Sequence, residues 1–285
     1  MMRSGLVTLA LAGLAITAFA GNSLLARAAL GDDAMGAAAF SAVRLAAGAL
    51  ILLPVIGRPP ARADWPGAIA LAVYVAGFSF AYRDITAGTG ALILFAAVQA
   101  TILLVSYAQG ERLTRAGWAG LALAMAGLVT LLAPGEAAVD PAAAGLMATA
   151  GVAWGAYTLI GRGAGDATGR TARSFLLAAL LMLPLLLWEA SHGPDPLLAT
   201  SDALSLAVVS GAVTSGLGYV AWYTVIPRLG LATVASVQLA TPVVAALGGA
   251  VWLAEPLGWR LMAGGALVLG GIVLTLGRPR KAAAS

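Results

Sequence analysis

The sequence contains no cysteine and only one histidine, His192, among its 285 residues. The lack of cysteine excludes disulfides and any metal site built on thiolate ligands. A single histidine in a polar loop also disfavours a histidine-based metal site. We therefore expect neither a metal ion nor another cofactor.

Charged side chains are also scarce, at 10% of the residues, whereas 61% of the residues are hydrophobic. Soluble domains carry about 25% charged residues, so this chain has too little polar surface to cover a water-facing globule. The composition indicates an integral membrane protein whose partner is the lipid bilayer. The net charge of +4 would also fit a nucleic-acid-binding protein, but excess Lys and Arg are typical of cytoplasmic loops of membrane proteins. We expect no nucleic-acid partner.

Ten stretches of the chain are apolar enough to cross a bilayer as helices. A spanning helix needs about 20 apolar residues, because the hydrocarbon core is about 30 Å thick and a helix rises about 1.5 Å per residue. The seventh stretch is the shortest, and the second contains a charge, Arg44. The predicted spans are residues 4–26, 34–57, 65–82, 85–110, 116–135, 141–161, 174–188, 203–227, 229–254 and 261–277.

The first span also has features of a secretory signal peptide. It combines a basic start and an apolar run with Ala18-Phe19-Ala20, which is similar to a cleavage site. Cleavage would leave nine spans. An internal repeat, described next, gives this span a counterpart later in the chain, which favours a retained helix.

Two short charged turns mark the repeat: GERLT at 110–114 and AEPLG at 254–258. Each turn joins two apolar segments, and Glu111 lies just ahead of a predicted helix N-terminus, where negative charge is favourable. This local role makes Glu111 a structural residue rather than a substrate ligand. With Glu111 aligned on Glu255, two glycine pairs of the following helices also align, Gly120 with Gly264 and Gly127 with Gly271.

A second match covers the first helix of each half: FAGNSLLAR at 19–27 aligns with WGAYTLIGR at 154–162. We interpret the chain as two five-helix repeats, 1–135 and 136–285, the second ending in a short basic tail. An odd number of helices gives the two repeats opposite orientations in the membrane. The sequence thus predicts an all-α integral membrane protein with ten transmembrane helices in a 5+5 inverted-topology repeat.

Positive charges also distribute unevenly between the two sides. With a cytoplasmic N-terminus, twelve of the 16 Lys and Arg residues fall in loops on that side, and three, Arg27, Arg83 and Arg260, fall on the other. This bias is the positive-inside pattern. It predicts a multi-pass protein of the bacterial inner (plasma) membrane with both termini in the cytoplasm.

Inverted repeats are typical of secondary transporters, in which two similar halves rock about a midplane site. Ten helices, this duplication and a Gly/Ala-Glu-x-Leu turn after the fourth helix of each half resemble the drug/metabolite transporter superfamily, in particular its EamA-type members. Pro242 also matches that family, whereas Val98, the corresponding residue of the first half, departs from it. Within the superfamily the chain is most similar to the YddG-type aromatic amino acid exporters. The resemblance implies a cavity between the first, third and fourth helices of each half.

Large polar and aromatic side chains at mid-helix depth are the candidate substrate ligands. A buried amide or phenol in a bilayer needs a partner, so these groups should face the protein interior or a wet cavity. Packing, or a place in the aromatic belt at the membrane surface, is the alternative role; Tyr82 and Tyr223 lie near helix ends, where belt residues occur. The predicted substrate-binding residues are Asn22, Tyr74, Phe78, Tyr82, Phe95, Gln99, Trp154, Tyr157, Trp222 and Gln238.

The charges restrict the substrate. Arg44 is the only charge within the predicted spans; it either binds a substrate carboxylate or serves a structural role, by extending to the membrane surface or pairing with polar groups. Phosphorylated substrates would need several Lys or Arg in the cavity. We therefore predict alternating-access export of neutral or zwitterionic metabolites, above all aromatic or large apolar amino acids.

Three alternatives remain at this stage: export of other metabolites or drugs, a non-transporting scaffold or receptor, and a membrane-embedded enzyme. An enzyme is disfavoured because such proteins gather Asp, His or Cys at the membrane surface, and here the only acidic pair is Asp32-Asp33. Small residues in the fifth and tenth spans are expected to bring these helices into close contact. We expect a monomer, with a dimer through these residues as the alternative. The small residues are Gly120, Ala124, Gly127, Gly264, Ala266, Gly270 and Gly271.

Overall fold

The structure is a computed structural model that describes residues 2–31, 33–110, 114–133, 139–161, 165–192, 200–225, 238 and 240–275. These residues form helices and short connections, with no strand among them. In chain order the helices are α1 (Met2–Leu30), α2 (Ala37–Leu52), η1 (Leu53–Val55), η2 (Arg62–Asp64), α3 (Trp65–Ala81), α4 (Ala87–Ala108), α5 (Arg115–Leu132), α6 (Pro141–Gly161), α7 (Ala167–Leu181), α8 (Leu183–His192), α9 (Ser201–Val209), η3 (Ser210–Leu217), α10 (Gly218–Val225), α12 (Ala240–Trp252) and α13 (Trp259–Thr275).

Most of these helices are long and apolar enough to cross a membrane. Eight stretches of the described chain have at least 18 residues and an apolar composition, and α12 and α13 are shorter apolar helices. The predicted all-helical, multi-pass membrane protein is therefore confirmed. The first part of the predicted ninth span lies outside the described residues.

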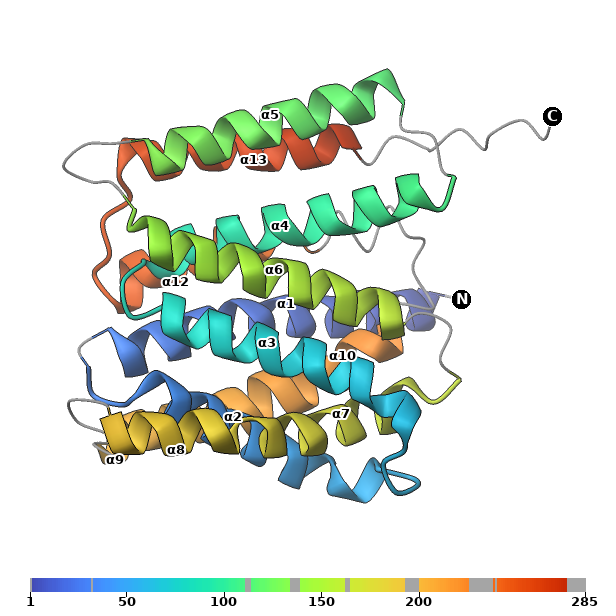
Figure 1. Cartoon of the computed structure of the whole chain (residues 1–285). Coiled ribbons are helices and arrows are strands. Elements are labelled where there is room, and N and C mark those ends of the chain that lie inside the picture. The colour runs from blue at the N-terminus through green and yellow to red at the C-terminus, as the bar shows by residue number, and fades with distance from the viewer. Residues whose placement is uncertain are drawn as a thin grey trace.

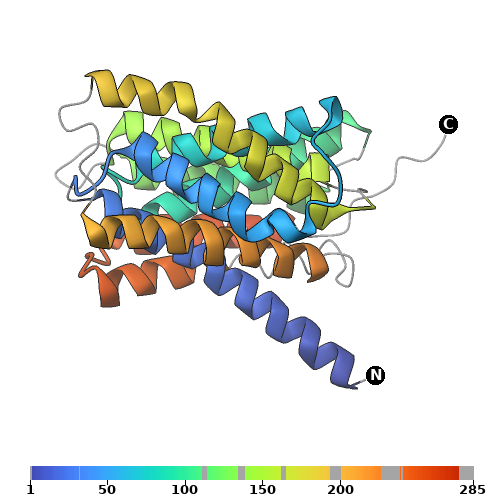
Figure 2. The same cartoon turned by 90° about the horizontal axis from the view of Figure 1, so that it is seen from below.

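The helices form one elongated bundle (Figures 1 and 2). The pair α5 and α13 lies at one edge, at the top of Figure 1, and α2 lies with α7, α8 and α9 at the opposite edge. Between these edges run α1, α3, α4, α6 and α10. The centre of the bundle is therefore built from helices that are far apart in the sequence.

The seventh span is longer than the sequence suggested. The prediction of 174–188 treated Arg173 as a loop residue, but α7 and α8 form one apolar stretch of 26 residues, Ala167–His192. Arg173 is 2% exposed and pairs with Asp64 at 3.2 Å and with Asp166 at 3.2 Å. These carboxylates neutralise the guanidinium, which allows the helix to continue through it. Arg44 is consequently not the only buried charge.

The fifth and tenth spans pack closely, as their small residues predicted. A Cβ atom on Gly127 would lie 2.6 Å from the carbonyl oxygen of Gly264, and one on Gly271 would lie 2.5 Å from the carbonyl oxygen of Gly120. Both distances are far below van der Waals contact, so only glycine allows this approach of α5 and α13. Side by side in Figure 1, the two helices run along the edge of the bundle.

Glu255 has a different role from the one the local sequence suggested for its counterpart Glu111. Its carboxylate accepts hydrogen bonds from the backbone N–H of Ala87 at 3.2 and 2.9 Å and pairs with Arg27 Nε at 3.3 Å. Ala87 is the first residue of α4, so Glu255 caps a distant helix rather than α13, which follows it. Glu111 lies outside the described residues.

Candidate substrate-binding site

Aromatic side chains gather around Trp154 in the middle of α6. The Trp154 ring centre lies 6.0 Å from that of Phe19 on α1, 5.0 Å from Tyr74 on α3, 5.5 Å from Tyr157 and 4.9 Å from Tyr219 on α10. Tilted and edge-on ring pairs at these distances are favourable. The cluster joins four helices that the chain order keeps apart.

A small pocket opens within this cluster, which we call the aromatic pocket. It holds about 270 Å³ of space outside the atoms, including the part open to solvent. The helices α1, α3, α4, α6 and α10 all contribute to its wall. They correspond to the first, third, fourth, sixth and eighth predicted spans, whereas the described part of the ninth span, including α12, contributes no lining residue. Its lining residues are Phe19, Asn22, Tyr74, Phe78, Leu94, Phe95, Trp154 and Tyr219.

Asn22 lies in the wall of the aromatic pocket and also connects α1 to the π-helix η3. Its Oδ1 accepts hydrogen bonds from Ser210 Oγ at 2.9 Å, Thr214 Oγ1 at 2.6 Å and Ser215 Oγ at 3.1 Å. Its Nδ2 donates to the Thr214 carbonyl oxygen at 3.3 Å. The amide oxygen is thus fully used, which leaves only the remaining Nδ2 hydrogen for a ligand.

Arg44 lies beside the aromatic pocket on α2 and is 0% exposed. Its Nε donates to Ser215 Oγ at 3.0 Å and its Nη2 donates to Tyr74 Oη at 3.1 Å. The guanidinium carbon is 4.8 Å from the ring centre of Phe78 and 5.4 Å from that of Tyr74. Arg44 therefore does not extend to the membrane surface, and its contacts link it to two residues of the pocket wall.

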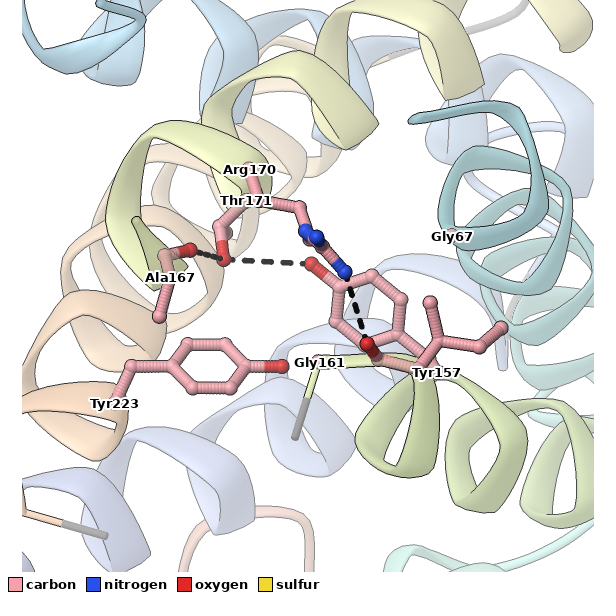
Figure 3. A pocket seen from close by; sticks show the side chains of 8 residues that line it. Gly67, Tyr157, Gly161, Ala167, Arg170, Thr171 and Tyr223 are labelled. Carbon is pink, nitrogen blue, oxygen red and sulfur yellow. Dashed lines mark hydrogen bonds between the residues drawn. The ribbon is translucent and has the colours of Figure 1, made fainter. Parts of the chain in front are cut away.

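A second pocket, drawn in Figure 3, lies toward the end of the bundle where α6 ends and α7 begins. In it Tyr157 Oη donates to Thr171 Oγ1 at 3.4 Å, and Arg170 Nη1 donates to the Ile160 carbonyl oxygen at 2.9 Å. The Tyr223 ring extends into the same space. We call this the tyrosine pocket; its lining residues are Gly67, Tyr157, Ile160, Gly161, Ala167, Arg170, Thr171 and Tyr223.

The predicted site residues divide between these places. Five of them line the aromatic pocket: Asn22, Tyr74, Phe78, Phe95 and Trp154. Tyr157 lines the tyrosine pocket.

The other four predicted residues line neither pocket. Trp222 is 1% exposed and packs on Phe19 with a ring distance of 5.5 Å. Tyr82 is also buried, so the membrane-belt role is wrong for it; its ring lies 4.6 Å from that of Phe78. Gln99 is half-buried and Gln238 is buried.

Two groups of residues were missing from the predicted set: two aromatic residues of the pocket wall, and the η3 hydroxyls that bond Asn22 behind it. Phe19 and Tyr219 line the aromatic pocket, and their neighbours in sequence, Asn22 and Trp222, had drawn attention to the same helices. The hydroxyls of η3 were not considered, because serine and threonine are common in apolar spans. Their spacing is the sequence pattern that could have identified them. Thr214 and Ser215 follow Ser210 by four and five residues, which places the three hydroxyls on nearly one helix face.

The described residues contain no group of three or more His, Cys, Asp or Glu side chains placed to hold a metal ion.

A bundle of membrane-spanning helices around an internal aromatic pocket is the architecture of a membrane transporter. The chain belongs to the EamA-like transporter family, whose profile matches residues 142–277. The resemblance to EamA-type members of the drug/metabolite transporter superfamily is thereby confirmed. The family name, like the name of one relative described below, indicates a transporter rather than an enzyme.

Similar proteins cover nearly the whole chain. An uncharacterised protein of Pseudomonas aeruginosa is 51% identical over 94% of this chain and 94% of its own. A protein of Streptantibioticus cattleyicolor, named a probable terminal-alkyne amino-acid exporter, is 30% identical over 89% of this chain and 90% of its own. A solved crystal structure of a protein shares the fold, with a TM-score of 0.66, 21% identity, and coverage of 94% of this chain and 96% of that one.

Proposed function

We propose that this protein is a secondary transporter that exports aromatic or large apolar amino acids. The aromatic pocket carries the proposal, because seven of its eight lining side chains are aromatic or amide. Rings from four helices, α1, α3, α6 and α10, meet around Trp154. Rings of this kind bind a flat apolar side chain by edge and face contacts. The relative named as an amino-acid exporter supports the same substrate class.

Alternating access by two inverted five-helix repeats, 1–135 and 136–285, is the proposed mechanism. The contact of α5 with α13 supports it, because Gly127 faces Gly264 while Gly120 faces Gly271. In the aligned repeats Gly264 is the counterpart of Gly120, and Gly271 is the counterpart of Gly127. Such an exchange of partners is the pattern of a contact across a two-fold axis.

The proposed binding residues are the five predicted ones in the aromatic pocket, with Phe19 and Tyr219 added. Tyr82 and Tyr157 each pack against one of these residues, Phe78 and Trp154 respectively. Tyr82 lies at the C-terminal end of α3, whereas Tyr157 lies in the tyrosine pocket. The two tyrosines therefore lie on opposite sides of the aromatic pocket along the length of the bundle. We assign them the role of shielding the bound substrate from the two membrane surfaces.

The proposed location is the bacterial inner membrane, with both termini in the cytoplasm. The excess of Arg and Lys in the loops on that side supports this orientation. In this orientation the tyrosine pocket, at the α6 C-terminal end, faces the cytoplasm. A monomer contains the whole of the aromatic pocket.

Reconstitution in liposomes tests the proposal. Vesicles loaded with unlabelled tryptophan or phenylalanine should accumulate the labelled amino acid by exchange, and empty vesicles should not. The assay is repeated with and without a pH gradient, which also reveals proton coupling. Absence of exchange for every aromatic and large apolar amino acid would overturn the substrate, and exchange of other metabolites or drugs would replace it.

A further inference from the structure

We propose that Arg44 binds the carboxylate of the transported molecule, together with the hydroxyl of Tyr219. The inference deepens the proposed function, on which it rests, since it names the charged group that the aromatic pocket selects. The proposed substrates are therefore carboxylates that carry an aromatic or large apolar group. The argument depends on the hydrogen bonds, the charges and the position of Arg44.

The first observation is an unused hydrogen-bonding capacity. Arg44 is 0% exposed and Tyr219 is 1% exposed, yet Arg44 Nη1 and Tyr219 Oη have no hydrogen-bond partner among the residues that the structure describes. Buried polar atoms are almost always paired, and an unpaired one costs free energy. Two such atoms at one edge of a pocket indicate a ligand that supplies the acceptor.

The second observation is an unbalanced charge. In the described part of the chain, the buried carboxylates all have other partners: Asp64 pairs with Arg58 and Arg173, Glu189 caps the N-terminus of α2, and Glu255 pairs with Arg27 and caps α4. Among these described residues, the groups that Arg44 contacts are neutral, namely the hydroxyls of Ser215 and Tyr74 and the ring faces of Tyr74 and Phe78. A buried guanidinium without a counter-charge is costly in a membrane interior.

The other buried arginine shows how the fold treats a structural charge. Arg173 is 2% exposed, and it meets the carboxylates of Asp64 and Asp166 as well as the backbone carbonyl of Ile56 at 2.7 Å. Its guanidinium is therefore fully balanced within the protein. Arg44 has no carboxylate beside it among the described residues. A purely structural role therefore does not explain why a positive charge is buried at this position.

The third observation is position. Tyr74 and Phe78 touch the Arg44 guanidinium and also line the aromatic pocket, where Tyr219 is a further wall residue. A carboxylate that enters between Tyr74 and Tyr219 reaches the guanidinium, while the rings around Trp154 hold the apolar part of the same molecule. Arginine is suited to this task, because its donors form paired hydrogen bonds with both oxygens of a carboxylate.

The wild-type protein gives the first test, without any variant. Exchange in proteoliposomes is measured for phenylalanine, phenylalaninamide and phenylethylamine. All three compounds carry the same ring, but only phenylalanine has a carboxylate. We expect phenylalanine to bind at least about tenfold more tightly than either analogue, because a charged hydrogen-bonded pair is lost with them. Equal affinity for all three overturns the inference, while exchange of phenylalanine itself leaves the proposed function standing.

Two variants give the second test. Arg44→Gln should weaken phenylalanine binding about 10- to 100-fold and leave phenylalaninamide nearly unchanged, and Arg44→Lys should restore part of the preference because the charge returns. An equal loss for acid and amide would show a structural role and overturn the inference. The ratio of the two affinities is the readout, since misfolding lowers both together.

Tyr219→Phe tests carboxylate binding independently, in case the Arg44 variants do not fold. This change removes a hydroxyl that has no hydrogen-bond partner in the described part of the chain, so the folded amount should stay the same. The preference for phenylalanine over its amide should fall about two- to fivefold, in line with one neutral hydrogen bond. Tyr107→Phe, an exposed tyrosine of α4, is the matched control, and an equal preference in both variants overturns the role of Tyr219.

Discussion

The carboxylate of Glu255 accepts hydrogen bonds from the backbone N–H of Ala87, at 3.2 Å to Oε1 and 2.9 Å to Oε2. This contact joins the turn between α12 and α13 to the N-terminus of α4. A helix N-terminus carries unpaired N–H groups and a partial positive charge, both of which a carboxylate satisfies. The turn between α12 and α13 thus supports the N-terminus of α4, a helix about 170 residues earlier in the chain.

Glu255→Ala should lower the thermal stability of the detergent-solubilised protein. The change removes the acceptor of the Ala87 N–H and the partner of Arg27, and the expected loss is about 1–3 kcal/mol. Asp202→Ala is the control, because Asp202 is an exposed acid in the first turn of α9. A melting temperature reduced equally by the two changes would contradict the proposed support of α4.

Gly271→Ala should destabilise the contact between α5 and α13. Its added methyl group would lie 2.5 Å from both the Gly120 carbonyl oxygen and the Ala124 backbone nitrogen, and overpacking of this kind costs about 1–3 kcal/mol. Gly145→Ala on α6 is the control, since nothing lies within 4 Å of the added atom, and alanine favours the helix by up to about 1 kcal/mol. Melting curves that move in the same direction for both variants would refute the close contact.

Asn22→Ala should reduce stability through the π-helix η3. It leaves the hydroxyls of Ser210, Thr214 and Ser215 without their shared acceptor, with an expected cost of about 1–3 kcal/mol. Thr149→Ala, at an exposed helix position, should change stability by less than about 0.5 kcal/mol. Unchanged melting of the Asn22 variant would show that η3 is held by its packing on the neighbouring helices and not by these hydrogen bonds.

Trp154→Leu should weaken the apparent affinity for tryptophan by about two- to tenfold, the range expected for the loss of one favourable ring contact. Uptake is normalised to the amount of folded protein in the vesicles. Trp188→Leu, at a tryptophan that is 55% exposed, provides the matched control. The aromatic pocket would not be the binding site if the two variants transported tryptophan with the same affinity.

Gln99→Ala should lower transport with little change in stability. Gln99 is half-buried on α4, and its side chain makes no hydrogen bond within the described part of the chain, so its removal should cost less than about 0.5 kcal/mol. Gln109→Ala, at the exposed C-terminal cap of the same helix, should leave transport intact. Normal uptake by the Gln99 variant would assign this residue to packing.

The helices and much of the site could be predicted from the sequence because both depend on local patterns. An apolar run long enough to span a bilayer must form a helix, since every backbone N–H and C=O needs a partner in lipid. Tyr74 and Phe78 stand four residues apart, so helical spacing alone places them on one face. Phe95 and Trp154 followed from similar reasoning and do line the aromatic pocket.

The sequence could not predict partners that come from distant helices. Arg173 looked like the end of a loop because its balancing carboxylate, Asp64, stands 109 positions earlier. The three hydroxyl partners of Asn22 likewise lie on η3, about 190 residues later. No local pattern encodes either pair.

The sequence by itself determined that this protein crosses the membrane as helices and that aromatic side chains lie within those helices, because hydropathy and helical spacing are properties of neighbouring residues. The tertiary structure decided which of these side chains meet, which carboxylate caps which helix, and that Arg44 is buried among neutral groups beside the aromatic pocket. The physical reason is that charge balance and hydrogen-bond pairing are settled only when segments distant in the chain are brought together.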